Sequence, residues 1–180
     1  MKKLSTITVY LLALFFFSAA ITGIELEEKM LIDKKVSLKI PKGFEVMQEQ
    51  MLKVKYPSER RPTIVYTNST GGINVALNLT INQASQELIP AYQENLRQTF
   101  AKLYPSAKGV RSGVEEVNGR KVAFIELVTP AIDSEIYNLI FLTDVDGKLL
   151  LCTFNCMVKD QVAWQPTARE IMASLKVTKL

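Results

Sequence analysis

The chain has 180 residues, of which 48% are hydrophobic and 22% charged, a balance that favours a folded domain over a disordered segment. Its formal net charge of +4 gives no reason to expect binding to nucleic acid. The sequence contains no histidine, which excludes catalytic triads and metal sites that depend on that residue.

The N-terminal segment is typical of an export signal. Lys2 and Lys3 precede an apolar run over residues 9–17, and the small residues 18–20 (Ser-Ala-Ala) offer a cleavage site. We therefore predict a signal peptide over residues 1–20.

Cleavage would leave one domain, residues 21–180, in the periplasm of a bacterium or secreted from it. A chain of this length supports one hydrophobic core and is short for two. The alternative is that residues 7–24 form an uncleaved anchor, although that length is borderline for a membrane span. We expect tethering to a membrane only in that case.

The first part of the domain carries strand and turn signals. Residues 36–40 and 74–81 alternate between apolar and polar side chains, and residues 63–67 are β-branched or aromatic. The segment 68–72 (Asn-Ser-Thr-Gly-Gly) between the last two runs has turn chemistry, so we predict a hairpin there. Residues 48–55 give a weak helical signal.

A long amphipathic helix is predicted over residues 85–104. Its apolar residues recur at helical spacing, and they are Leu88, Ile89, Tyr92, Leu96, Phe100 and Leu103. The helix begins either at a cap on Ser85 or at Pro90, because proline is tolerated only in the first turn.

A hairpin is predicted next, with Asn118-Gly119 as a two-residue turn between residues 110–117 and 120–129. This register places Glu116 opposite Lys121, which pairs opposite charges.

Asp146-Gly147 predicts a second hairpin, between residues 135–145 and 148–156. The register places Phe141 opposite Cys152. Both strands are apolar on both faces, which is typical of strands in the middle of a sheet that is covered on each side.

The last helix is predicted over residues 159–175, with a break at Pro166. The complete order of elements predicts an α+β fold, an α/β/α sandwich around a central antiparallel sheet of about six or seven strands.

The two cysteines of the predicted domain, Cys152 and Cys156, are expected to remain free thiols. On a regular strand their Cα atoms would be roughly 13 Å apart, at about 3.3 Å per residue, whereas a disulfide needs less than about 7 Å. A bridge would require the strand to end near Phe154 and the chain to turn.

No group of residues predicts an enzyme, a metal site or a cofactor. Glu115 and Glu116 are neighbours on a strand and therefore point to opposite faces. Asp144 and Asp146 lie beside a turn that explains Asp146-Gly147 without a cation.

A basic and aromatic loop is the candidate partner-binding site. Arg60 and Arg61 lie between prolines, and Tyr56 and Tyr66 are near in sequence. Guanidinium and aromatic groups are enriched in protein interfaces, so the loop suits an acidic partner surface. The alternative is a solvated loop without a binding role.

Three stretches resemble the PsbP-like fold family, in particular its DcrB-like bacterial envelope proteins. They are Pro-Lys-Gly-Phe at 41–44, the run from Lys-Tyr-Pro-Ser to Tyr-Thr-Asn at 55–68, and the ending from Cys-Thr-Phe-Asn-Cys to Ser-Leu-Lys at 152–176. The family also includes PsbP of photosystems and the Ran-binding Mog protein of yeast. The resemblance implies a PsbP-like domain and an accessory or binding role. No cysteine stands near the predicted cleavage point, so the lipid anchor of DcrB is not expected here.

Two functions remain open from the sequence. The first is an exported, non-catalytic protein that binds an envelope protein or a membrane-associated complex. The second is a carrier of a small apolar ligand or lipid, with a pocket between the sheet and the helices.

Overall fold

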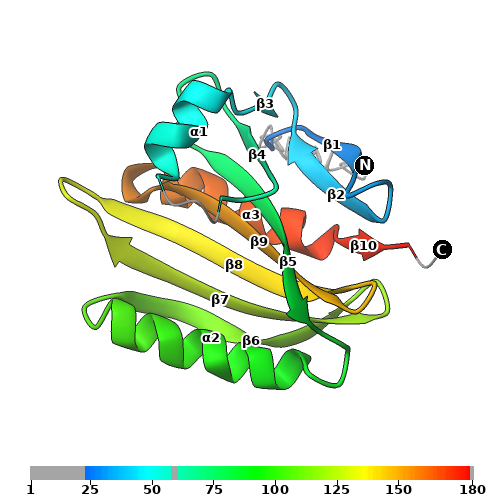
Figure 1. The fold of residues 1–180 in the computed structure, drawn as a ribbon. Helices are drawn as coiled ribbons and strands as arrows, with labels where there is room; N and C mark the ends of the chain where they lie inside the picture. Colours follow the sequence, from blue (N-terminus) through cyan, green and yellow to red (C-terminus); the bar gives the residue numbers. More distant parts are fainter. Residues whose placement is uncertain (1–22, 58–60, 179–180) are drawn as a thin grey trace, which may run out of the picture.

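The computed structural model describes residues 23–57 and 61–178. A seven-stranded sheet, antiparallel throughout, forms the middle layer (Figure 1). In spatial order its strands are β3 (Glu45–Val46), β4 (Ile64–Thr67), β5 (Asn74–Gln83), β9 (Lys148–Met157), β8 (Glu135–Val145), β7 (Arg120–Pro130) and β6 (Lys108–Val117).

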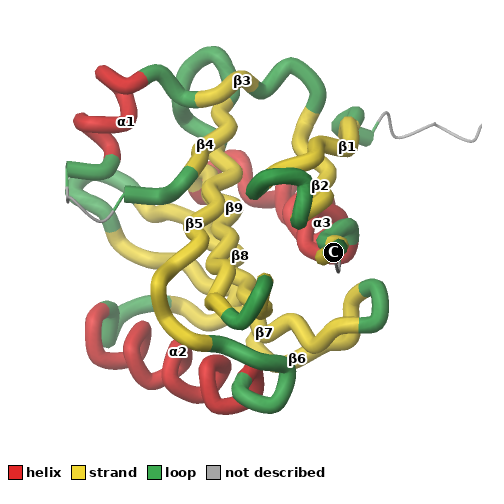
Figure 2. The backbone as a smooth tube through the Cα atoms, turned by 45° about the vertical axis from the view of Figure 1, so that its right-hand side comes forward, coloured by secondary structure: helices red, strands yellow, loops and turns green. Residues whose placement is uncertain are grey.

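Different elements cover the two faces of this sheet (Figure 2). Helices α1 (Glu49–Lys55) and α2 (Ile89–Leu103) lie on one face. The other face carries a 3-10 turn (Val158–Asp160), helix α3 (Gln161–Ala173) and a small antiparallel sheet of β1 (Leu26–Leu31), β2 (Val36–Pro41) and β10 (Lys176–Val177), in the order β1-β2-β10. The predicted α/β/α architecture and strand number are confirmed.

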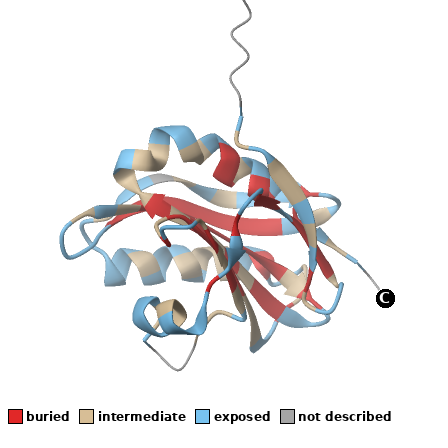
Figure 3. Ribbon diagram, turned by 90° about the horizontal axis from the view of Figure 1, so that it is seen from above, coloured by how far each residue is buried: buried red, intermediate tan, exposed pale blue. Residues whose placement is uncertain are grey.

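The alternation of side chains along each central strand explains why both faces are covered. On β7, Phe124 belongs to the large core under α3, whereas Ile125 belongs to the core under α2. The large core also contains the fully buried rings of Tyr137, Phe141 and Phe154. Figure 3 shows the buried residues concentrated in these central strands.

Both predicted registers are confirmed. Glu116 is opposite Lys121, and Phe141 is opposite Cys152. The turn residues Asn118 and Gly119 have φ angles of 48° and 76°, as a two-residue turn requires.

The predicted strand at residues 36–40 is present as β2, but it pairs with β1 and β10 outside the central sheet. The sequence gives no sign of β1, because its consecutive polar residues 27–29 (Glu-Glu-Lys) do not alternate with apolar ones. Alternation along a strand predicts that it has a buried face but does not predict which strand it pairs with.

The predicted break at Pro166 is wrong, since α3 continues through this residue. Pro166 has no N–H to donate to the carbonyl of Val162 one turn earlier. Both residues are exposed, so water can bond that carbonyl. The buried face of α3, with Ala168, Ile171 and Met172, holds the helix against the sheet in spite of the missing hydrogen bond.

Candidate functional site

The loop between α1 and β4 contains most of the residues that the sequence suggested for partner binding. Arg60 lies outside the described residues. The side chain of Arg61 is 30% exposed and folds back onto α1. Its Nε donates to the carbonyl of Tyr56 at 3.0 Å, and its Nη1 lies 3.3 Å from Oε1 of Glu49. The guanidinium of Arg61 is therefore already engaged within the chain.

The structure brings Tyr56 and Arg61 together but separates them from Tyr66. Tyr56 is half-buried against Val65 and Met47 on the α1 face of the sheet, and this burial raises the pKa of its hydroxyl. Tyr66 packs against the large core on the opposite face, opposite Val75 of β5. The three described residues thus do not form one surface.

A small open pocket of about 230 Å³ lies beside Tyr56. Its wall includes Pro62, and its floor includes Asn78 of β5 with Thr153 and Asn155 of β9. Among the described residues, its lining offers hydroxyl and amide groups and no charged side chain.

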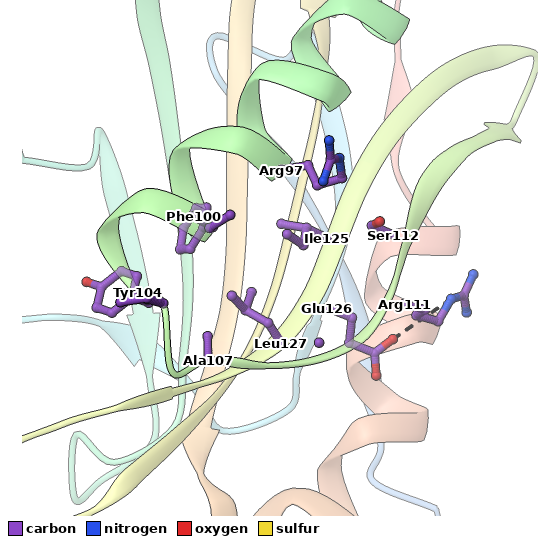
Figure 4. A pocket seen from close by; sticks show the side chains of 12 residues that line it. Arg97, Phe100, Tyr104, Ala107, Arg111, Ser112, Ile125, Glu126 and Leu127 are labelled. Carbon is purple, nitrogen blue, oxygen red and sulfur yellow. Dashed lines mark ion pairs between the residues drawn. The ribbon is translucent and has the colours of Figure 1, made fainter.

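A larger open cleft, of about 350 Å³, lies between the C-terminal end of α2 and strands β6 and β7 (Figure 4). We call it the α2 cleft. Phe100 and Tyr104 from the end of α2 form one wall, with ring centroids 5.8 Å apart and an interplanar angle of 22°. Ile125 and Leu127 of β7 form the apolar floor. Tyr104 is 37% exposed, so an approaching molecule can reach its ring.

One ion pair borders the α2 cleft. Arg97 binds Glu94 through two hydrogen bonds of 2.9 Å and 2.7 Å, and the bonds from Arg97 and Gln98 lower the pKa of Glu94 to about 2. Arg111 also borders the cleft, but its side chain lies on the α3 face of β6, where it pairs with Glu115 and covers the ring of Phe124. With Arg97 and Ser112 at its edge, the cleft has a polar rim and an apolar floor, an arrangement typical of protein interfaces.

Glu126 borders the same cleft, but its side chain points to the α3 face and is fully buried. Its carboxylate accepts hydrogen bonds from Arg169, from Gln165 and from the hydroxyl of Tyr137 at 2.9 Å. Burial alone would raise the pKa of Glu126, but these hydrogen bonds outweigh it and hold the pKa below its usual range. This group stabilises the contact between α3 and the sheet.

The acidic residues considered for catalysis are engaged elsewhere. Glu115 and Glu116 are opposite Val122 and Lys121, on different faces of the sheet. Asp144 pairs with Arg120, and Asp146 pairs with Lys35 at 2.6 Å. Within the described residues no group of three or more acidic or cysteine side chains could hold a metal ion.

Cys152 and Cys156 both lie on the regular strand β9, where they are buried free thiols. Burial raises the pKa of both thiols, that of Cys156 to about 12.

The sequence did not indicate the α2 cleft. The helical spacing of Phe100 indicates only that it belongs to the apolar side of its helix, and nothing local distinguishes Ile125 and Leu127 from other strand residues. The cleft exists because α2 ends at Leu103 before it covers the whole of β6 and β7, and this depends on how the helix crosses the sheet.

No family model and no curated protein matches the sequence. Solved structures do match. The cyanobacterial PsbP of Synechocystis aligns with a TM-score of 0.61 at 12% identity, over 88% of this chain and 96% of that protein. The fold is that of PsbP. The PsbP-like fold expected from the sequence is thereby confirmed.

Two further structures share this fold. LpqN of Mycobacterium tuberculosis, described as involved in cell envelope biogenesis, aligns with a TM-score of 0.56 at 11% identity, over 80% of this chain and 83% of LpqN. A protein of Bacteroides thetaiotaomicron aligns with a TM-score of 0.55 at 10% identity, over 84% of this chain but only 48% of its own length. In the part of this PsbP-like chain that the structure describes, no helix is long and apolar enough to cross a membrane.

Proposed function

We propose that this PsbP-like chain is an exported, non-catalytic accessory protein of the bacterial cell envelope that binds another protein. The envelope role rests on the predicted signal peptide at residues 1–20 and on the shared fold with LpqN. The acidic side chains that could have served catalysis are engaged in turns and ion pairs, which favours a binding role.

The observation that carries the proposal is the α2 cleft. It presents the stacked rings of Phe100 and Tyr104 above the apolar floor of Ile125 and Leu127. Aromatic residues in a partly desolvated pocket with a polar rim contribute much of the binding energy in protein interfaces. We therefore assign the cleft to an apolar or aromatic side chain of the partner.

Site-specific photo-crosslinking in the producing bacterium tests this assignment. A benzophenone amino acid is introduced at Ala101 or Tyr104, which line the cleft. The control position is Met30, which is exposed on β1 and belongs to the opposite side of the sheet. We expect the same envelope protein to be crosslinked from both cleft positions and not from Met30.

A third position, Arg61, tests the loop that the sequence suggested. Crosslinking of the partner from Arg61 and not from Ala101 or Tyr104 would move the site to that loop. Crosslinking of lipid alone at the cleft would contradict protein binding and favour the carrier function. A crosslink only to a second copy of this chain would also contradict the proposed function.

A further inference from the structure

Strand β6 leaves one edge of the central sheet open. It has ten residues, and in the described part of the chain it pairs with β7 alone. The side chains of Ser112, Val114 and Glu116 are exposed along it. An open edge of this length is a template for another strand unless the chain prevents pairing.

The register of the β6–β7 hairpin determines which amides are free. In a two-residue turn, the flanking residues Val117 and Arg120 form a hydrogen-bonded pair. Because hydrogen-bonded pairs alternate along an antiparallel ladder, Ser112, Val114 and Glu116 direct their N–H and C=O groups away from β7. The register is unbroken from Val117 to Arg111. The edge therefore presents a regular row of free hydrogen-bonding groups.

The charges on this segment are self-complementary. Arg111, Gly113 and Glu115 lie on the α3 face of β6, and Arg111 reaches Glu115 across the glycine, which has no side chain. If two antiparallel copies of β6 are centred on Gly113, Arg111 of each copy is opposite Glu115 of the other. Ser112 of one copy is then opposite Val114 of the other. The free N–H and C=O groups of these two residues can form the hydrogen bonds between the copies. No like charges face each other between residues 111 and 115.

We propose that two copies of this chain pair through β6, in the register centred on Gly113, so that one sheet continues through both copies. Edge strands that avoid pairing often carry lysine, proline or charges of one sign. In β6, by contrast, the positive Arg111 of one copy faces the negative Glu115 of the other. Strand pairing alone buries less surface than a standard interface, so the dimer is weak and depends on concentration.

Sedimentation velocity of residues 21–180, from about 5 μM to about 500 μM, measures the dimer. Val114→Pro is the main variant. The N–H of Val114 points away from β7, so its loss in proline blocks the addition of a strand without removing a hydrogen bond of the hairpin. Proline is tolerated at such edge positions. We expect the dissociation constant to rise at least tenfold, while the matched Val114→Ala variant stays within about threefold of the parent chain.

Charge variants test the register. Glu115→Arg places Arg111 opposite arginine, and Arg111→Glu places Glu115 opposite glutamate, so each variant alone should be monomeric. Mixing the two should restore dimers, because each contact then joins opposite charges. A parent chain that is monomeric at 500 μM overturns the proposal. A dimer that Val114→Pro does not weaken also overturns it. If that variant is misfolded by circular dichroism, failure of the mixed charge variants to form dimers overturns the proposal instead.

Discussion

Arg169 of α3 binds the buried carboxylate of Glu126 through two of its guanidinium nitrogens, Nε and Nη2. Its Nε lies 3.1 Å from Oε2, and its Nη2 lies 2.9 Å from Oε1. The side chain of Glu126 has no exposed surface, whereas that of Arg169 is 39% exposed. The pair therefore fixes α3 to the sheet with the charge of Glu126 fully desolvated.

Substitution of Glu126 by glutamine should lower the free energy of unfolding by about 2–3 kcal/mol, because it leaves the arginine without its counter-charge. Urea unfolding at neutral pH measures this change. The matched control is Glu170→Gln on α3, next to Arg169, which breaks an exposed ion pair with Lys39 and should change stability by less than about 0.5 kcal/mol. Equal effects of the two substitutions would contradict the structural role of Glu126.

The same carboxylate gives a pH dependence with a definite sign. The pKa of Glu126 in the folded chain is below its ordinary value of 4.5. Its contribution to the free energy of unfolding is therefore complete above about pH 4.5, the pKa of Glu126 in the unfolded chain. This contribution is lost as the pH falls through the lower, folded-state pKa. The stability difference between the parent chain and Glu126→Gln should therefore be constant near neutral pH and shrink in acid. A difference that grows as the pH falls would contradict this sign.

Pro166 offers a substitution that should stabilise the chain. Alanine at this exposed position restores the N–H that bonds the carbonyl of Val162 and has a higher helix propensity. We expect thermal and urea unfolding to show a gain of about 1 kcal/mol or more. The control Val162→Ala, one turn earlier, should change stability by less than about 0.5 kcal/mol. A loss of stability in Pro166→Ala would mean that the helix bends at this residue in solution.

The cysteines should behave as two buried free thiols. Iodoacetamide without reductant should label neither Cys152 nor Cys156 in the folded chain, because both are buried and their raised pKa values keep them protonated. Intact-mass measurement after alkylation in urea, again without reductant, should show two labels. An unlabelled mass in urea would show that they form a disulfide and that β9 does not stay regular.

The export prediction concerns residues outside the described part of the chain. Cleavage after Ala20 should give a mature protein that begins at Ile21 or within a few residues of it. Edman sequencing of the protein from the periplasmic fraction measures this. Recovery of a chain that retains Met1 in the membrane fraction would support the uncleaved anchor over residues 7–24.

Local patterns were sufficient for the hairpins and for every strand of the central sheet except the short β3, Glu45–Val46. Asn118-Gly119 and Asp146-Gly147 each fix a turn and a register, because few residues accept the φ angles of a two-residue turn. Those patterns could not predict that residues 36–40 join a second sheet, because pairing partners far apart in sequence are chosen by packing. Pro166 shows the same limit, since tertiary contacts of α3 outweigh a local helix-breaking signal.

The candidate site was harder to predict than the fold. The basic loop was suggested by composition, but Arg61 is bound to Glu49, and Tyr66 lies on the opposite face from Tyr56. The α2 cleft arises from the position at which a helix ends above two strands. Sequence periodicity predicts which residues of a helix face the sheet, but not how far the helix covers it.

Partner binding at the α2 cleft is tested most directly by the affinity of the purified chain for the partner identified by crosslinking, compared with that of Tyr104→Ala. The exposed ring of Tyr104 contributes to the cleft and little to the core, so the melting temperature should hardly change. Calorimetric titration should show at least about tenfold weaker binding, the loss expected for an aromatic residue at the centre of an interface. The double variant Arg60→Ala with Arg61→Ala should bind nearly as well as the parent chain. Unchanged affinity in Tyr104→Ala, with the loss confined to the arginine variant, would contradict the assignment of partner binding to the α2 cleft.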